Sequence, residues 1–216
     1  MKDKDLPKDY AIGWTDFLGI RIDLRYKPLI PRVETIFWIE RELPNLKDKK
    51  RILDIFSGSG CLGLYLLKNI PNAKVDFSDI SENCIKQIKY NLKINKLKAN
   101  KVILSDIFEN ISDKYDLIVA NPPYVPSKRK LPASVVKYES DYVYAGIDGL
   151  KYILPFLEKS LLFLKKGGIL LMEIDDTQKT SITKILKKCK ISNFEFLKDQ
   201  YQRIRVLKIY NGGIEY

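Results

Sequence analysis

Short apolar segments alternate with helical patterns through the middle of this 216-residue chain, and this alternation constrains the fold more than any other feature. Four of these segments, residues 51–56, 73–78, 101–104 and 116–120, have the length and apolar content of buried strands. Strands that alternate with helices are typical of a parallel sheet covered by helices on both faces. We therefore predict an α/β, doubly wound fold with four strand–helix units from residue 51 to about residue 164.

The residues before these units predict a separate N-terminal feature. Apolar and charged side chains alternate over residues 20–26, which is the period of a half-buried strand. With the aromatic segment around Trp14 and Phe17, this strand predicts a β-hairpin. We expect residues 1–28 to form a short segment with this hairpin, and residues 29–216 to form the main domain.

The residues after the fourth strand predict the elements that close the sheet. Two strands near the C-terminus have a connection too short for a helical crossover, so we predict an antiparallel hairpin there. In chain order, the remaining predicted elements are a helix at 35–43, a helix at 147–164, a turn at 166–168, a strand at 169–174, a helix at 180–188 and the closing strands 194–198 and 203–209.

Composition excludes several kinds of chemistry. The chain contains no histidine, which excludes Ser-His and Cys-His nucleophile pairs and histidine metal sites. Its three cysteines, Cys61, Cys84 and Cys189, lack metal-binding spacing, so we expect reduced thiols and no metal ion. There is no apolar run of about 18 residues, and the charged start is not typical of a signal peptide. We therefore expect a cytoplasmic protein that does not contact a membrane.

The net charge of +11, from 38 basic and 27 acidic residues, has two interpretations. A basic surface favours an anionic partner, and the cluster Lys128-Arg129-Lys130 is the best candidate for a weak contact with RNA or the ribosome. Lysines scattered over solvated helix faces would give the same charge without any partner. The sequence leaves both interpretations open.

The segment Asn121-Pro122-Pro123-Tyr124 follows the apolar strand 116–120, where open α/β sheets place their ligands. The two prolines fix their φ angles and remove two backbone donors, so carbonyl groups stay free while the amide and the ring are held rigidly. Such a segment predicts a pocket for a planar group that carries an NH2, with acceptors for its hydrogens and an aromatic face for stacking. A proline turn that closes a strand is the alternative.

A glycine loop, Ser57-Gly58-Ser59-Gly60, lies between the first strand and a helical pattern that starts at Cys61. A strand, a glycine turn and a helix are typical of nucleotide-binding units, because glycines let the backbone approach a ligand closely. The spacing is neither that of NAD enzymes nor that of phosphate-binding loops, so the loop alone is a weak signal.

Acidic residues follow the next two strands. Asp79 comes about 20 residues after the glycines, which is the spacing of a carboxylate that holds ribose hydroxyls. Asp106 is placed to accept a hydrogen bond from an adenine amino group, with Ile107 packed on the ring. Taken alone, Asp79 fits a helix-capping or turn role better than a ribose contact, and a turn role explains Asp106 equally well.

Taken together, these motifs come in the order of the class I S-adenosylmethionine (SAM) methyltransferases, which the chain resembles over about residues 10–210. Within that class it is similar to the HemK/PrmC family of protein-glutamine N5-methyltransferases. Its residues 29–35, Leu-Ile-Pro-Arg-Val-Glu-Thr, look like that family's Leu-Ile-Pro-Arg-Pro-Glu-Thr. Other matching positions are Asp54 to Gly60, Asp79, Ser105 to Phe108, Asn121 to Tyr124, Tyr138, Glu139, Gly146 to Leu150, Met172 to Ile174, Gln178, Lys198, Asp199 and Arg205.

The resemblance implies a Rossmann-like fold with seven strands, and methyl transfer from SAM to the side-chain amide nitrogen (N5) of a glutamine, leaving S-adenosyl-L-homocysteine. The glutamine is that of the Gly-Gly-Gln loop of a peptide-chain release factor. We assign Asn121, Pro122 and Tyr124 as catalytic residues, and the whole segment Asn121, Pro122, Pro123 and Tyr124 as the substrate site. The implied cofactor residues are Asp54, Phe56, Ser57, Gly58, Ser59, Gly60, Asp79, Asp106, Ile107 and Asn121.

Some residues depart from the family pattern. Val33 and Ser140 replace prolines, Ala145 replaces a glycine, and Phe56 stands where a glycine is usual. Only about ten residues precede the hairpin, so the helical domain with which the family grips its protein substrate is expected to be missing. These changes put the recognition of the substrate in doubt more than the binding of SAM.

Two other functions remain open at this point. An adenine-N6 or guanine-N2 methyltransferase of DNA or RNA shares the Asn-Pro-Pro-Tyr pocket, because an exocyclic base amine is also a planar NH2. A catalytically silent SAM-binding or ribosome-associated module is the other. The roles of Arg32 and Glu139, as an ion pair or as substrate contacts, and of Glu173, as a pocket residue or a cap, are likewise open.

Overall fold

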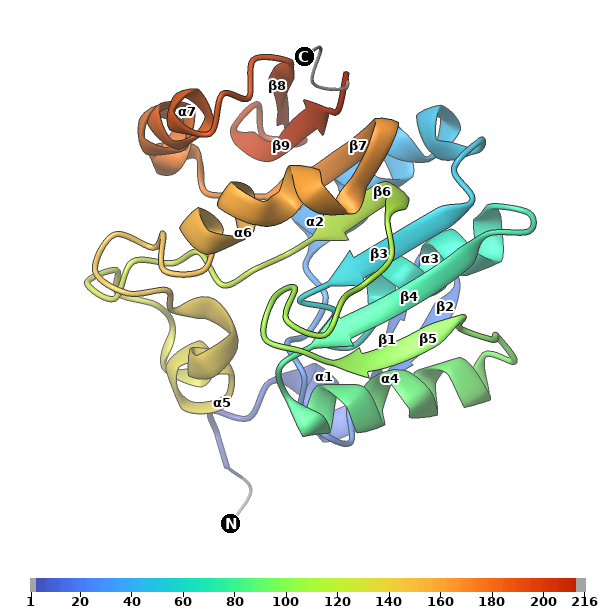
Figure 1. Ribbon diagram of the computed structural model, residues 1–216. Helices are drawn as coiled ribbons and strands as arrows, with labels where there is room; N and C mark the ends of the chain where they lie inside the picture. Colours follow the sequence, from blue (N-terminus) through green and yellow to red (C-terminus); the bar gives the residue numbers. More distant parts are fainter. Residues whose placement is uncertain (1–2, 213–216) are drawn as a thin grey trace.

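The computed structural model describes residues 3–212 and contains a seven-stranded sheet with helices on both faces (Figure 1). In order across the sheet, the strands are β5 (Lys101–Leu104), β4 (Lys74–Asp79), β3 (Arg51–Ile55), β6 (Tyr115–Ala120), β7 (Leu164–Glu173), β9 (Ile204–Tyr210) and β8 (Phe194–Lys198). The first five pair in parallel, whereas β9 runs antiparallel between β7 and β8. The predicted fold class, with its closing antiparallel hairpin, is confirmed.

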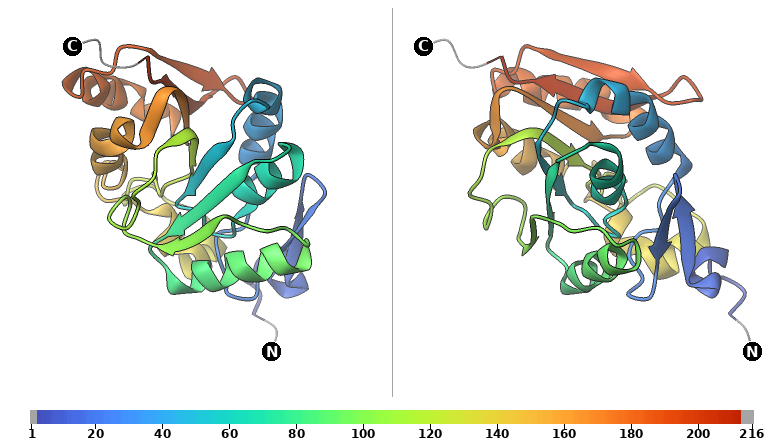
Figure 2. Two further views of the ribbon diagram at one scale, coloured as in Figure 1. Left: turned by 45° about the vertical axis from the view of Figure 1, so that its right-hand side comes forward. Right: turned by 90° about the vertical axis from the view of Figure 1, so that its right-hand side faces the viewer.

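Helices cover both faces of the sheet (Figure 2). Each face also has its own apolar core. Consecutive strand residues point to opposite faces, so Ile52 and Leu117 join one core while their neighbours Leu53 and Ile118 join the other. The first core is completed by α2 (Val33–Glu42), α3 (Cys61–Asn69) and α4 (Glu82–Ile94), and the second by α6 (Ile153–Ser160) and α7 (Lys179–Lys188).

The predicted N-terminal hairpin is present as β1 (Trp14–Phe17) and β2 (Ile20–Asp23), after a short helix, α1 (Lys8–Ile12), that was not predicted. Its buried side chains Phe17, Ile20 and Ile22 join the first core. Asn91 of α4 holds β2, because its Oδ1 accepts a hydrogen bond from the Asp23 N–H at 2.9 Å. The hairpin therefore packs onto α4 as part of the same body.

The predicted helix at 147–164 was too long. In the structure α6 starts at Ile153, and a 3-10 turn at Leu161–Phe163 follows it. Pro155 explains the start, because proline is tolerated in the first turn of a helix but clashes with the preceding turn when it lies further in. The predicted turn at 166–168 is an irregularity inside β7, where Gly167 has a φ of 75°.

Two further differences concern the connections. The link between β5 and β6 consists of turns rather than the expected helix, and the Ser105 hydroxyl organises it by accepting the Asn110 N–H at 2.9 Å. A helix that was not predicted, α5 (Ala133–Val143), lies after the Asn-Pro-Pro-Tyr segment. No helix within residues 3–212 is long and apolar enough to cross a bilayer.

Because Ile118 is fully buried under α6, an Ile118→Ala variant should lose about 2–5 kcal/mol of the free energy of unfolding. Urea unfolding measures this loss. Leu162→Ala is the matched control, since that side chain is 66% exposed and its truncation should change stability by no more than about 0.5 kcal/mol. Equal effects of the two substitutions would contradict the assignment of the second core.

Candidate active site

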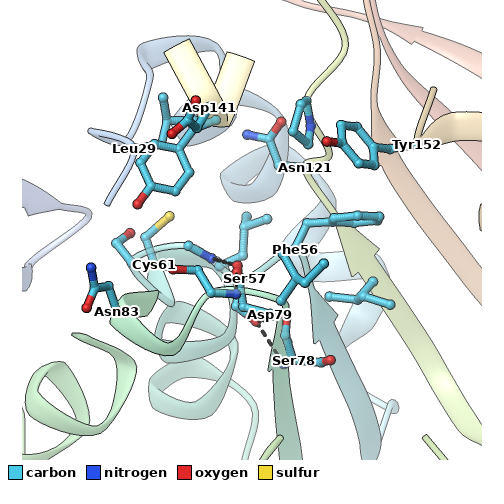
Figure 3. A pocket seen from close by; sticks show the side chains of 18 of the residues that line it. Leu29, Phe56, Ser57, Cys61, Ser78, Asp79, Asn83, Asn121, Asp141 and Tyr152 are labelled. Carbon is cyan, nitrogen blue, oxygen red and sulfur yellow. Dashed lines mark hydrogen bonds between the residues drawn. The ribbon is translucent and has the colours of Figure 1, made fainter. Parts of the chain in front are cut away.

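A cavity of about 390 Å³ opens at the carboxyl ends of β3, β4, β5 and β6 (Figure 3). Figure 3 shows Asn121 on one wall and Phe56, Ser57 and Asp79 on the opposite one. A second, smaller cavity of about 50 Å³ adjoins it and shares some of its wall, including Asn121 and Pro123. The sequence motifs that end neighbouring strands are thus brought together at one edge of the sheet.

The glycine loop forms the floor of the large cavity. Phe56, Ser57, Gly58 and Ser59 line it, and a Cβ built on Gly58 would meet no protein atom within 4 Å. The Ser57 hydroxyl donates to the carbonyl of Asp54 at 2.7 Å, which holds the turn in place. The absent side chain at Gly58 therefore leaves space that a ligand can fill.

Asp54 and Gly60 do not line the cavity, although both were predicted to contact the cofactor. The Asp54 carboxylate lies behind the loop and accepts a hydrogen bond from the Gly63 N–H at 2.9 Å. Burial raises the pKa of Asp54 well above its usual value. Gly60, with a φ of 81°, caps the start of α3 and packs against Ile88. The structure gives both residues roles in shaping the loop.

Asp79 presents a half-buried carboxylate to the large cavity. It accepts hydrogen bonds from the N–H groups of Gly58 at 2.8 Å and Ser81 at 2.9 Å. Burial raises its pKa, and these hydrogen bonds oppose that shift. Asp106 and Ile107 line the same cavity from the turn after β5, and Ile107 has a φ of 46°. These three predicted residues are thus placed around one space.

The Asn-Pro-Pro-Tyr segment separates the two cavities. Asn121 and Pro123 line both of them, while Pro122 and Tyr124 line the smaller one. The Tyr124 carbonyl accepts a hydrogen bond from Gln178 Nε2 at 2.9 Å, and the same amide nitrogen reaches the Gly149 carbonyl at 3.0 Å. Any side chain at position 149 would collide with the Tyr124 carbonyl, since a Cβ there would lie 2.2 Å from that oxygen. The Gln178 hydrogen bonds and the close approach of Gly149 therefore hold the Asn-Pro-Pro-Tyr segment in place.

A buried carboxylate, Glu173 at the end of β7, holds the side chains of the segment. It accepts hydrogen bonds from the Tyr124 hydroxyl at 2.9 Å, from the Thr35 hydroxyl at 2.7 Å and from the Trp38 indole at 3.0 Å. Burial, and then the charge of Glu173, raise the pKa of Tyr124 well above its usual value. Glu173 is thus a pocket residue. Thr35 belongs to the segment 29–35 that the sequence analysis singled out without giving it a role, and Trp38 is a site residue that no motif indicated.

Arg32 and Glu139 form an ion pair at the edge of the site. The other oxygen of the buried Glu139 accepts the Ile30 N–H at 2.9 Å. This pair joins the segment before α2 to α5, so the ion-pair interpretation of these two residues agrees with the geometry. Leu29, from the segment 29–35, also lines the large cavity, and further lining residues that no motif indicated are Asn83, Asp141, Tyr142 and Tyr152.

The basic cluster that follows the segment is partly neutralised. Arg129 pairs with Asp175, whose pKa is raised by burial but is lowered overall to about 2 by hydrogen bonds from Arg129 and Thr177. Lys128 and Lys130 are exposed. Within residues 3–212 no ion pair of the kind that holds Arg129 involves either lysine, so these two residues carry the surface charge of the cluster.

Comparisons with known proteins agree with this geometry. The family model Methyltransferase small domain matches residues 39–137. The chain is 33% identical to the release factor glutamine methyltransferase of Streptococcus pneumoniae, over 95% of this chain and 75% of that protein. It is 34% identical to that of Clostridium botulinum, over 96% and 77%. A methyltransferase structure from Pyrococcus furiosus superposes with a TM-score of 0.64 at 18% identity, over 96% of this chain and 95% of that one.

A mixed seven-stranded sheet of this order, with its cavity at the strand ends, defines a SAM-dependent methyltransferase of class I. The identity to the two bacterial relatives covers nearly the whole chain. The chain therefore belongs to the family of the release factor glutamine methyltransferases, as its resemblance to the HemK/PrmC family predicted.

A Gly58→Ala variant should bind SAM about tenfold or more weakly, because the added methyl group would enter the large cavity. Isothermal titration calorimetry measures the dissociation constant. Gly167→Ala is the matched control, since Gly167 also has a positive φ and open space around its Cα but lies far along the chain in β7. Both variants carry a similar backbone strain of about 1–2 kcal/mol. An equal loss of SAM affinity in both would therefore contradict the placement of SAM in the large cavity beside Gly58.

Proposed function

We propose that this protein methylates the side-chain amide nitrogen (N5) of the glutamine in the Gly-Gly-Gln loop of a peptide-chain release factor. The relatives that share about a third of its sequence are release factor glutamine methyltransferases, which supports this acceptor. The observation that carries the proposal is the position of Asn121, on the wall between the large cavity and the small one. A group bound in the small cavity would face a ligand bound in the large one.

The large cavity suits SAM, which supplies a methyl group on a positively charged sulfur. Its volume of about 390 Å³ lies within the range of small-molecule sites. The Asp79 carboxylate offers acceptors for ribose hydroxyls, Asp106 offers one for an adenine amino group, and Phe56 and Ile107 offer apolar contacts. The open space above Gly58 accommodates the rest of the molecule. We expect the product, S-adenosyl-L-homocysteine, to occupy the same residues.

The small cavity suits a primary amide. Its volume of about 50 Å³ exceeds the roughly 10–15 Å³ that a cavity needs to hold one water molecule, so it holds a small group of atoms. The Asn121 oxygen and the Pro122 carbonyl would accept hydrogen bonds from the amide NH2, and the Tyr124 ring would lie against its plane. Fixing the nitrogen in this way lowers the barrier by orientation, because the attack needs alignment more than it needs a base.

An Asn121→Ala variant should lose about 100-fold or more of the rate of transfer to the release factor, because an acceptor for the amide hydrogens is removed. The assay uses labelled SAM with the organism's own release factor, with total RNA and with DNA. Mass spectrometry then locates the label. We expect it on the glutamine of the Gly-Gly-Gln loop.

The matched control is Lys128→Ala, which removes an exposed charge a few residues beyond the segment. A protein acceptor held in the small cavity predicts a rate within about twofold of the unchanged protein, since exposed charges contribute little. Label on nucleic acid with none on the release factor, together with a slower Lys128→Ala variant, would overturn the proposal and identify a base amine as the acceptor.

A further inference from the structure

We propose that Thr35 is a positioning residue that fixes the orientation of the Asn121 side-chain amide, with its NH2 toward Thr35. Glu173 makes this possible because it accepts the hydrogen of the Thr35 hydroxyl. The inference rests on the proposed function, since it explains how Asn121 presents an oxygen to an NH2 group. It assigns a role to two residues of α2 and β7 that lie far from Asn121 in the sequence. The hydrogen-bond polarity of the cluster carries it.

The first step concerns the Thr35 hydroxyl. Glu173 Oε2 lies 3.0 Å from Trp38 Nε1 and 2.7 Å from Thr35 Oγ1. An indole N–H can only donate, so Oε2 is an acceptor in this cluster. The Thr35 hydroxyl carries a single hydrogen, and that hydrogen points to Oε2. All three side chains are at most 2% exposed, so water does not compete for these bonds.

The second step concerns Asn121. With its hydrogen used, the Thr35 oxygen can only accept, and the Asn121 amide contacts it at 3.5 Å. The group that faces Thr35 must therefore be the NH2, because two oxygens without a hydrogen between them would repel. The Asn121 oxygen is directed away from Thr35 and is available at the cavity wall, where Figure 3 shows the side chain.

The Glu173 carboxylate orients both side chains that would contact a substrate amide, Asn121 and Tyr124. Oε2 acts on Asn121 through Thr35, while Oε1 accepts the Tyr124 hydroxyl at 2.9 Å and so fixes the ring. Burial lowers the pKa of Arg205, but the negative charge of the nearby Glu173 opposes this effect, and the pKa is raised overall. A positive neighbour of this kind compensates a buried carboxylate. The site therefore offers a hydrogen-bond acceptor, the Asn121 oxygen. It selects substrate groups that carry N–H.

The test compares two substitutions of Thr35. Thr35→Val keeps the shape and removes the hydroxyl, so we expect kcat for the release factor to fall about 10- to 100-fold, with SAM affinity and unfolding midpoint little changed. Thr35→Ser keeps the hydroxyl and should restore most of kcat. A kcat within twofold of the unchanged protein, or an equal loss of SAM affinity and stability, would overturn the inference.

A second readout does not depend on turnover. In protein labelled with ¹⁵N-asparagine, the side-chain NH2 signals of Asn121 are assigned by their loss in Asn121→Asp. They should shift in Thr35→Val and stay in place in Thr35→Ser, and identical spectra of all Thr35 variants would contradict the inference. If the unchanged protein methylates a base amine instead of the release factor, the proposed function fails. The ratio of the kcat values of Thr35→Val and Thr35→Ser on the base amine still tests the inference.

Discussion

The shared register of the parallel strands decides where every functional group lies. Ile55 is paired with Ser78 on one side and with Ala120 on the other, and Ala120 is paired with Met172. The residues that follow these four positions along the chain, Phe56, Asp79, Asn121 and Glu173, therefore reach the same edge of the sheet. A slip of one residue would turn the side chains of a strand to the opposite face, so the two separate cores also keep the site together.

Hydrogen bonds and prolines make this edge of the sheet rigid. Gln178 clamps the carbonyls of Tyr124 and Gly149, and Glu173 holds the Tyr124 hydroxyl. The prolines restrict the backbone between them. A site whose side chains are fixed in advance loses little conformational entropy when the substrate binds. It can therefore hold the two reacting groups in the alignment that a direct displacement needs.

Features that depend on a local sequence pattern could be predicted from the sequence. Contacts between segments that are far apart in the chain could not. Strand ends, the glycine loop and the Asn-Pro-Pro-Tyr segment are continuous in the chain, so their positions were predictable. Thr35 belongs to α2, and only the packing of that helix against β7 brings its hydroxyl to Glu173. Asp54 is a second example: the family resemblance implied a cofactor contact there, and only the fold shows that its carboxylate accepts the Gly63 N–H from the first turn of α3.

The cluster also bears on what happens to the amide proton in the proposed reaction. The oxygens of Glu173 already accept three hydrogen bonds, and burial with the charge of Glu173 raises the pKa of Tyr124, so the phenol stays neutral. Neither group is placed to remove a proton before transfer. A nitrogen that has gained a methyl group is positively charged and gives its proton to water without a strong base. A chain without histidine is therefore sufficient for this chemistry, provided that Asn121 and its neighbours hold the nitrogen in line.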